Sequence, residues 1–134
     1  MSYFDYFLAP VPRANKAAYE KLAKLSERVV KEHGALSVME CWLDESGPDA
    51  STYHGAETRQ TQVQYESFAK AAGARQDETV VISYVEWPNK AARDAGMEKV
   101  TNDARMQFGN QAPAFDGRRL IAAGFKPMLG ASDA

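Results

Sequence analysis

The sequence predicts an α+β fold of the ferredoxin-like type, in which helices cover one face of a four-stranded antiparallel sheet. Strand-like and helix-like segments alternate in the order strand, helix, strand, strand, helix, strand. The chain has 134 residues, of which 45% are hydrophobic, so residues 1–134 are expected to form a single domain with a sizeable core. Right-handed crossovers then predict the spatial order fourth, first, third and second strand.

The first half of the chain supplies a strand, a helix and a second strand. Residues 3–12 are rich in aromatic side chains and end at two prolines, which is typical of a strand that stops. Apolar side chains recur at helical spacing from residue 18 to 30, with Asn15 as the expected N-cap and Gly34 as the expected terminator. Residues 35–43 are then expected to form the second strand.

The second half begins with a long polar loop at residues 46–62, which contains a Gly-Pro pair and is of the length that is often functional. A short helix is expected near residues 65–74, and residues 78–87 give the clearest strand pattern. Asn89 is expected to cap the next helix, and Asp103 to cap a further turn. Residues 118–129 are predicted to be the last strand, and residues 130–134 a disordered tail.

Alternation along each strand assigns its side chains to two faces. A charge beneath a packed helix is costly unless it is paired, so the sets that contain Asp5, Glu40, Glu86 and Arg119 are expected on the helix-free face. The remaining sets, which include Cys41, would then lie under the helices. On that assignment the helix-free face also carries a large apolar set: Tyr3, Phe7, Val38, Trp42, Ile82, Tyr84, Ile121 and Phe125.

An apolar face of this size is not expected to stay exposed on a monomer, so a homodimer that covers the helix-free face is predicted. Two such sheets would enclose an apolar space that contains a few carboxylates. Asp5, Trp42 and Tyr84 are the predicted ligand-binding residues of that space, and Glu40 and Glu86 are the best candidates for a catalytic proton carrier. The alternative is that these carboxylates form an interface ion-pair network with Arg118, Arg119 or Lys126, and that the aromatic side chains only pack.

The sequence also resembles a known family. The segments HGALSVMECWLDE, ETVVISYVEWPNKAARDAG, NDARM and FDGRRLIAAGF look like the YbaA-like bacterial proteins, a family of unknown function. That family in turn resembles the dimeric α/β-barrel superfamily, so the resemblance implies a dimeric barrel. It implies no reaction, because fold alone does not specify function.

Other classes of site have weaker support. Cys41 is the only cysteine, and its expected place under the helices makes it a packing residue. The two histidines, His33 and His54, have no metal-ligand spacing, so no metal and no cofactor are expected. The net charge of −2 argues against nucleic acid, and no apolar run or leader-like start indicates a membrane or secretion, so a cytoplasmic protein is expected.

The predicted function is therefore a homodimer that binds or transforms a small apolar or aromatic molecule in a cavity on the helix-free face. The alternative is a non-catalytic interaction or stress-related dimer with no small-molecule site. The sequence leaves open whether the protein is an enzyme.

Overall fold

The computed structural model describes residues 1–53 and 65–130. A single sheet contains β1 (Tyr3–Pro12), β2 (Ser37–Trp42), β3 (Glu78–Trp87) and β4 (Ile121–Phe125). Its strand order is β2-β3-β1-β4 and every neighbouring pair is antiparallel, which confirms the predicted strand order. The last strand is shorter than predicted at both ends, because residues 117–119 form a 3-10 turn and the strand already ends at Phe125.

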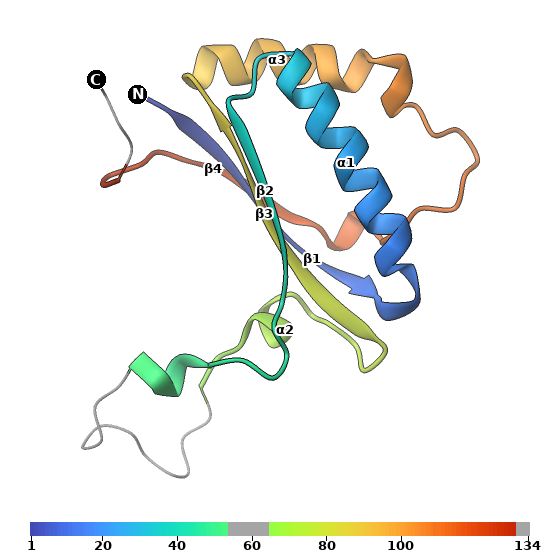
Figure 1. Ribbon diagram of the computed structural model, residues 1–134, viewed down its shortest axis with the longest axis vertical. Helices are drawn as coiled ribbons and strands as arrows, with labels where there is room; N and C mark the ends of the chain where they lie inside the picture. Colours follow the sequence, from blue (N-terminus) through green and yellow to red (C-terminus); the bar gives the residue numbers. More distant parts are fainter. Residues whose placement is uncertain (54–64, 131–134) are drawn as a thin grey trace.

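Two long helices, α1 (Lys16–Glu32) and α3 (Lys90–Asn102), lie on the same side of the sheet (Figure 1). The short helix α2 (Phe68–Ala71) and the 3-10 turn at Ala50–Tyr53 belong to the connection between β2 and β3. Two further 3-10 turns, Arg13–Asn15 and Ala104–Met106, flank the long helices. In the described part of the chain, no helix is both long and apolar enough to cross a membrane.

The caps explain where the helices begin and end. Asn89 accepts a hydrogen bond from the Ala92 amide at the start of α3, and Asp103 accepts one from the Arg105 amide, as predicted. Gly34 follows α1 with a φ of 114°, which glycine adopts without steric cost. Asn15 precedes α1, but its side chain donates to the Ala114 carbonyl instead of capping the helix.

The core lies between the helices and the sheet, in two clusters of buried side chains. One cluster contains Val29, Val30, Ala35, Trp87 and Val100, and the other contains Ala9, Val11, Tyr19 and Val81. Gly96 of α3 allows close packing here, since a Cβ at this position would lie 2.4 Å from Cζ3 of Trp87. The helices therefore cover the side chains of β1 and β3 that share a face with Val11 and Trp87.

The face predicted for two of the four strands is wrong. Asp5 is buried on the helix side, where it pairs with Arg93 of α3, and Glu40 contacts Tyr19 of α1. The charge argument failed because both carboxylates have partners on the helices: Asp5 forms an ion pair with Arg93, and Glu40 accepts a hydrogen bond from Tyr19 and keeps an exposed surface. For β3 and β4 the prediction is correct, because Tyr84 and Phe125 lie on the helix-free face.

Arg119 also differs from its prediction. It lies in the 3-10 turn Gly117–Arg119, not in the last strand, and its guanidinium donates to both carboxylate oxygens of Glu78 at 2.7 and 2.8 Å. A third hydrogen bond joins it to the Gly73 carbonyl. These contacts fix the start of β4 against the start of β3 within one chain.

The helix-free face is apolar and open in the single chain. Phe4, Tyr6, Tyr84 and Phe125 form a continuous set of aromatic contacts, with ring centroids 5.1 to 6.0 Å apart. The exposed fraction of its large side chains is 38% for Tyr6, 48% for Met39, 37% for Ile82, 51% for Ile121 and 52% for Phe125.

The polar loop predicted at 46–62 is described only as far as Tyr53, so its remainder, with His54, lies outside the described residues, as do residues 131–134 of the predicted tail.

Candidate functional site

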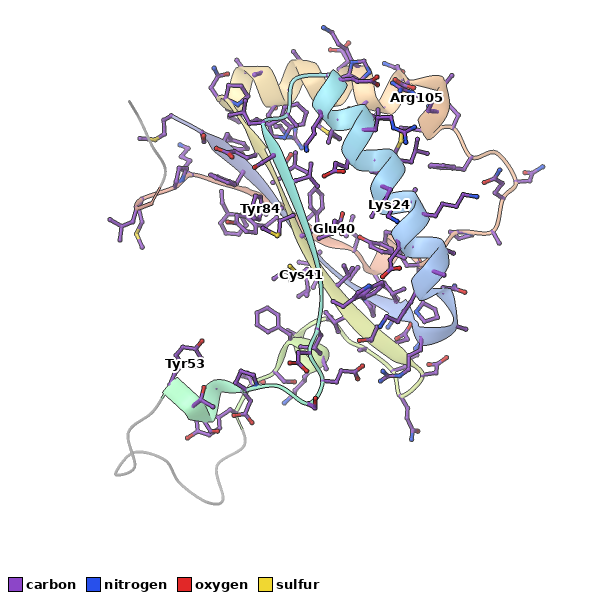
Figure 2. The ribbon with its side chains drawn as sticks, in the orientation of Figure 1. Lys24, Glu40, Cys41, Tyr53, Tyr84 and Arg105 are labelled. Atoms are coloured by element: carbon purple, nitrogen blue, oxygen red, sulfur yellow. The ribbon has the colours of Figure 1, made fainter. Side chains whose placement is uncertain are left out.

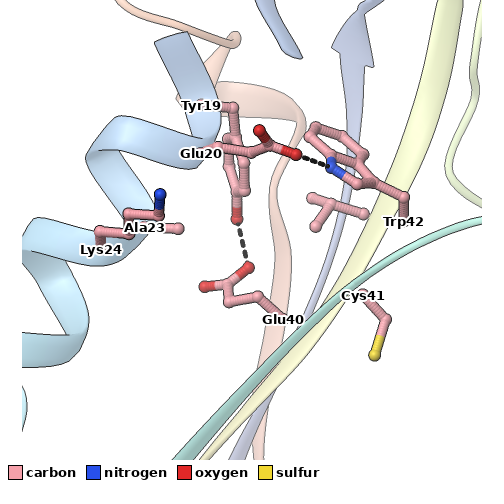
Figure 3. Close-up of a pocket in the computed structure, with 8 residues that line it drawn as sticks. Tyr19, Glu20, Ala23, Lys24, Glu40, Cys41 and Trp42 are labelled. Carbon is pink, nitrogen blue, oxygen red and sulfur yellow. Dashed lines mark hydrogen bonds between the residues drawn. The ribbon is translucent and has the colours of Figure 1, made fainter. Parts of the chain in front are cut away.

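A cavity with a volume of about 370 Å³ lies between α1 and β2, on the helix side of the sheet. Figure 3 shows α1 on one side of it and β2 on the other. The residues that line it are Tyr19, Glu20, Ala23, Lys24, Glu40, Cys41, Trp42 and Val81. We call it the α1/β2 groove.

A tyrosine–carboxylate pair occupies the centre of this groove. The Tyr19 hydroxyl, on α1, donates a 2.8 Å hydrogen bond to Oε1 of Glu40, on β2 (Figure 3). The ring of Tyr19 is buried and packs edge-on against Trp42 and Phe115, which fixes the direction of its hydroxyl. In the sequence, helical spacing places Tyr19 on the mostly apolar face of α1. Its hydroxyl could therefore have been identified from the sequence as a polar group on that face.

Partial burial changes the proton affinity of both groups. It raises the pKa of Glu40, and hydrogen bonds from Tyr19 and Ser83 offset only part of this effect. The pKa of Tyr19 is also raised, first by burial and then by the charge of Glu40. Glu40 nevertheless keeps an exposed surface at the groove. A carboxyl group that is reachable from solvent and holds its proton more tightly than usual is suited to proton transfer.

The tryptophan of the groove is fixed by polar contacts. The Trp42 indole N–H donates to Oε2 of Glu20 at 2.8 Å, and the ammonium group of Lys16 lies 5.0 Å from the centroid of the Trp42 ring. Glu20 and Lys16 both belong to α1, so these contacts hold the edge strand β2 to the helix. The indole ring consequently forms a fixed apolar wall of the groove.

Cys41 is placed differently from its prediction. It lies on the helix-free side of β2 and is exposed, not buried beneath the helices. In Figure 3 its sulfur points away from Glu40 and from the Tyr19 hydroxyl. Its thiol is therefore separate from the Tyr19–Glu40 pair.

The residues predicted to line one cavity are separated in the structure. Only Glu40 and Trp42 share the groove. Asp5 is 5% exposed and accepts hydrogen bonds from Arg93 Nε at 3.1 and 3.2 Å and from Trp87 Nε1 at 3.2 Å. Asp5 thus belongs to the contact between α3 and the sheet and does not line the α1/β2 groove.

Tyr84 and Glu86 lie on the opposite side of the sheet from the groove. Figure 2 shows Tyr84 on the helix-free side and Glu40 on the side of α1. Tyr84 belongs to the aromatic set described above, and Glu86 accepts hydrogen bonds from the Ser2 and Ser37 hydroxyls at 2.7 and 2.8 Å. Neither residue can act on a ligand that is bound beside Glu40.

Two further features bear on the site. A smaller cavity of about 220 Å³ lies between the end of β2, β3 and Phe68, and it is mostly apolar. Within residues 1–53 and 65–130, no group of three or more histidine, cysteine, aspartate or glutamate side chains is arranged to hold a metal ion.

Comparison with known proteins assigns the family. Residues 2–117 match the model of the family described as "Protein of unknown function (DUF1428)". The chain is also 36% identical over 130 residues to the uncharacterized protein YbaA of Escherichia coli K12, and equally to that of Shigella flexneri; the match covers 96% of this chain and 98% of each relative. The chain therefore belongs to the DUF1428 family of proteins of unknown function, which includes these YbaA-like bacterial proteins.

Proposed function

We propose that this protein is a cytoplasmic homodimer that binds or transforms a small, partly apolar molecule in the α1/β2 groove, with Glu40 as the proton carrier. The observation that carries the proposal is the Tyr19–Glu40 pair, because it presents a carboxyl group of raised pKa at the wall of a cavity. Carboxyl groups with this combination of partial burial and a fixed hydrogen-bond donor are characteristic of sites that move protons.

The volume of the groove supports a small ligand. About 370 Å³ is at the lower end of the range for small-molecule sites, which suits a molecule of roughly one ring with short substituents. Ala23, Val81 and the Trp42 ring supply apolar contact, and the polar atoms of Tyr19 and Glu40 supply direction. The groove replaces the helix-free face as the proposed ligand site, since two of the predicted site residues meet here.

A ligand screen by thermal shift tests this proposal, because a ligand that binds only the folded state raises the melting temperature. Compounds that stabilise the wild-type protein are then tested on Ala23→Leu, in which a larger side chain fills the groove without disfavouring the helix. We expect Ala23→Leu to lose the shift and Glu40→Gln to weaken it. Ligands that stabilise Ala23→Leu as well as the wild type would refute the groove as the binding site.

Homodimer formation through the helix-free face rests on a separate observation. The aromatic set and its exposed aliphatic neighbours form a broad apolar surface, and large surfaces of this kind mark interaction sites. The same surface supports the alternative function, a non-catalytic interaction protein, if the groove binds nothing.

Sedimentation equilibrium tests the dimer. We expect the wild type to be dimeric at micromolar concentration and Ile121→Lys, on the helix-free face, to be monomeric. Ala91→Lys, on the exposed surface of α3, is the matched control and should remain dimeric. A wild-type chain that is monomeric up to about 100 μM, which means an association free energy weaker than about −5.5 kcal/mol, contradicts the dimer and leaves the groove proposal intact.

A further inference from the structure

We propose that the ligand of the α1/β2 groove is a small organic anion, most simply a carboxylate, and that Lys24 is the cation that binds its charge. This inference rests on the proposed function, because it specifies the chemistry of the molecule that the groove accepts. Lys24 is an exposed residue of α1 and lines the groove together with Glu40. Figure 3 shows Lys24 on the helix side of the groove and Glu40 on the strand side.

The first argument is that the intrahelical partner of Lys24 is occupied elsewhere. Glu20 is four residues before Lys24, the spacing at which glutamate and lysine commonly pair on a helix. The Glu20 carboxylate instead accepts the indole N–H of Trp42 at 2.8 Å. Within the described residues, no carboxylate lies within ion-pair distance of the Lys24 ammonium group.

The second argument is that Glu40 does not neutralise Lys24 either. The effects that set the pKa of Glu40 are burial and hydrogen bonds from Tyr19 and Ser83, and burial is the largest of them. Because its pKa is raised, Glu40 carries less negative charge at a given pH than an ordinary glutamate. In the part of the chain that the structure describes, the groove therefore contains a cation without an ion-pair partner, beside a carboxyl group whose pKa is raised by burial.

These charges select among ligands. A cationic ligand would meet Lys24, and the two carboxylates of the groove, Glu20 and Glu40, already accept hydrogen bonds from Trp42 and Tyr19. An anionic ligand gains the Lys24 ammonium group and, when Glu40 is protonated, a hydrogen-bond donor opposite it. A carboxylate with a short aliphatic or single-ring body satisfies these groups and also fills the apolar part of the groove formed by Ala23, Val81 and Trp42.

The test uses matched acid and amide probes, namely phenylacetate with phenylacetamide and hexanoate with hexanamide. Binding is followed by the indole N–H resonances in ¹⁵N–¹H NMR spectra, because the chain has only two tryptophans. Trp42 lines the groove and reports binding there, whereas Trp87 is fully buried in the core and serves as an internal reference. Lys24→Met removes the charge, and Lys21→Met removes a charge from the same helix outside the groove.

We expect each acid to shift the Trp42 resonance at lower concentration than its amide. Lys24→Met should weaken acid binding about two- to fivefold, the effect of one partly exposed ion pair, and should leave amide binding unchanged. Lys21→Met should change neither. Acid binding in the wild type should also weaken more than amide binding as the salt concentration rises.

Two outcomes overturn the inference, and they differ in what else they affect. If acids and amides bind equally well and Lys24→Met binds both as the wild type does, the anionic ligand class is wrong while the groove remains a binding site. If none of the probes shifts the Trp42 resonance at millimolar concentration, both the inference and the proposed function lose their support.

Discussion

The buried pair of Asp5 and Arg93 offers a sharp test of the structure, because the sequence alone placed Asp5 in a ligand cavity. Asp5 accepts hydrogen bonds from Arg93 Nε and from Trp87 Nε1, and its side chain is 7% exposed, against 36% for Arg93. Replacing Asp5 by alanine leaves a buried indole N–H without an acceptor and a guanidinium without its counter-ion.

The magnitude follows from these contacts. Removing one partner of a fully buried ion pair costs about 3–5 kcal/mol, and an unsatisfied buried donor costs about 1–3 kcal/mol. Because the guanidinium can be partly hydrated after the substitution, the lower end applies, and we expect Asp5→Ala to lower the free energy of unfolding by about 3 kcal/mol. Asp5→Asn keeps an acceptor for Trp87 but loses the charge, so a loss of about 1–2 kcal/mol is expected.

Urea denaturation followed by tryptophan fluorescence measures the effect, since the buried Trp87 reports on the transition. The double variant Asp5→Leu/Arg93→Met should be less destabilised than the sum of its single variants, because neither charge remains without its partner. A loss below about 1 kcal/mol for Asp5→Ala, or strict additivity in this cycle, would show that the pair does not hold α3 to the sheet.

Three further predictions concern the groove, the core and the last strand. Burial raises the folded-state pKa of Glu40, so its ionised form opposes folding at high pH. Glu40→Gln should therefore raise the melting temperature at pH 8 by an amount on the order of 1 °C and should leave it unchanged at pH 4. A rise of equal size at both pH values refutes this explanation. Gly96→Ala places a Cβ 2.4 Å from the Trp87 ring and should lower the free energy of unfolding, measured by urea denaturation, by about 1–3 kcal/mol. In the control Gly117→Ala the added Cβ has no atom within 4 Å, so the free energy of unfolding should change by less than about 0.5 kcal/mol. Similar values for both variants would contradict the close packing at Gly96. Arg119 lowers the pKa of Glu78 from 4.5 to about 2, so their pair stabilises the fold above pH 4.5 and this stabilisation is lost as the pH falls toward 2. Arg119→Met should lower the free energy of unfolding at pH 7 by about 1–3 kcal/mol, weaken the dependence of stability on acid pH and speed hydrogen exchange in β4. An unchanged dependence of stability on acid pH would disprove the role of the pair.

The strand order and most element boundaries could be predicted from the sequence, because they depend on local patterns. The strand at 78–87, the caps at Asn89 and Asp103 and the glycine after α1 all carry signals within a few residues. Arg119 was misplaced because the turn that contains it is fixed by Glu78, which lies 41 residues earlier in the chain.

The strand faces could not be predicted so reliably, because alternation gives only the relation between residues of one strand. Which set faces the helices depends on partners that are distant in the sequence. The partner of Asp5 is 88 residues away, and that of Glu40 is 21 residues away on another element. A charge without a partner would have been costly under a helix, as the sequence argument assumed, but Asp5 is ion-paired with Arg93, and Glu40 accepts a hydrogen bond from Tyr19 and keeps an exposed surface.

The prediction that Cys41 lies on the opposite face of β2 from Glu40 and Trp42 was nevertheless correct, and this separation matters for the proposed function. Alternation places Glu40 and Trp42 on one face and Cys41 on the other, and the structure retains this separation although both faces are exchanged. The groove and the apolar face are consequently on opposite sides of the same sheet. A second copy that covers Tyr6, Tyr84 and Phe125 would leave the groove open to solvent. The proposed ligand binding at Glu40 and the proposed association through the helix-free face can therefore be tested one at a time, and a variant that loses one while it keeps the other separates the two proposals.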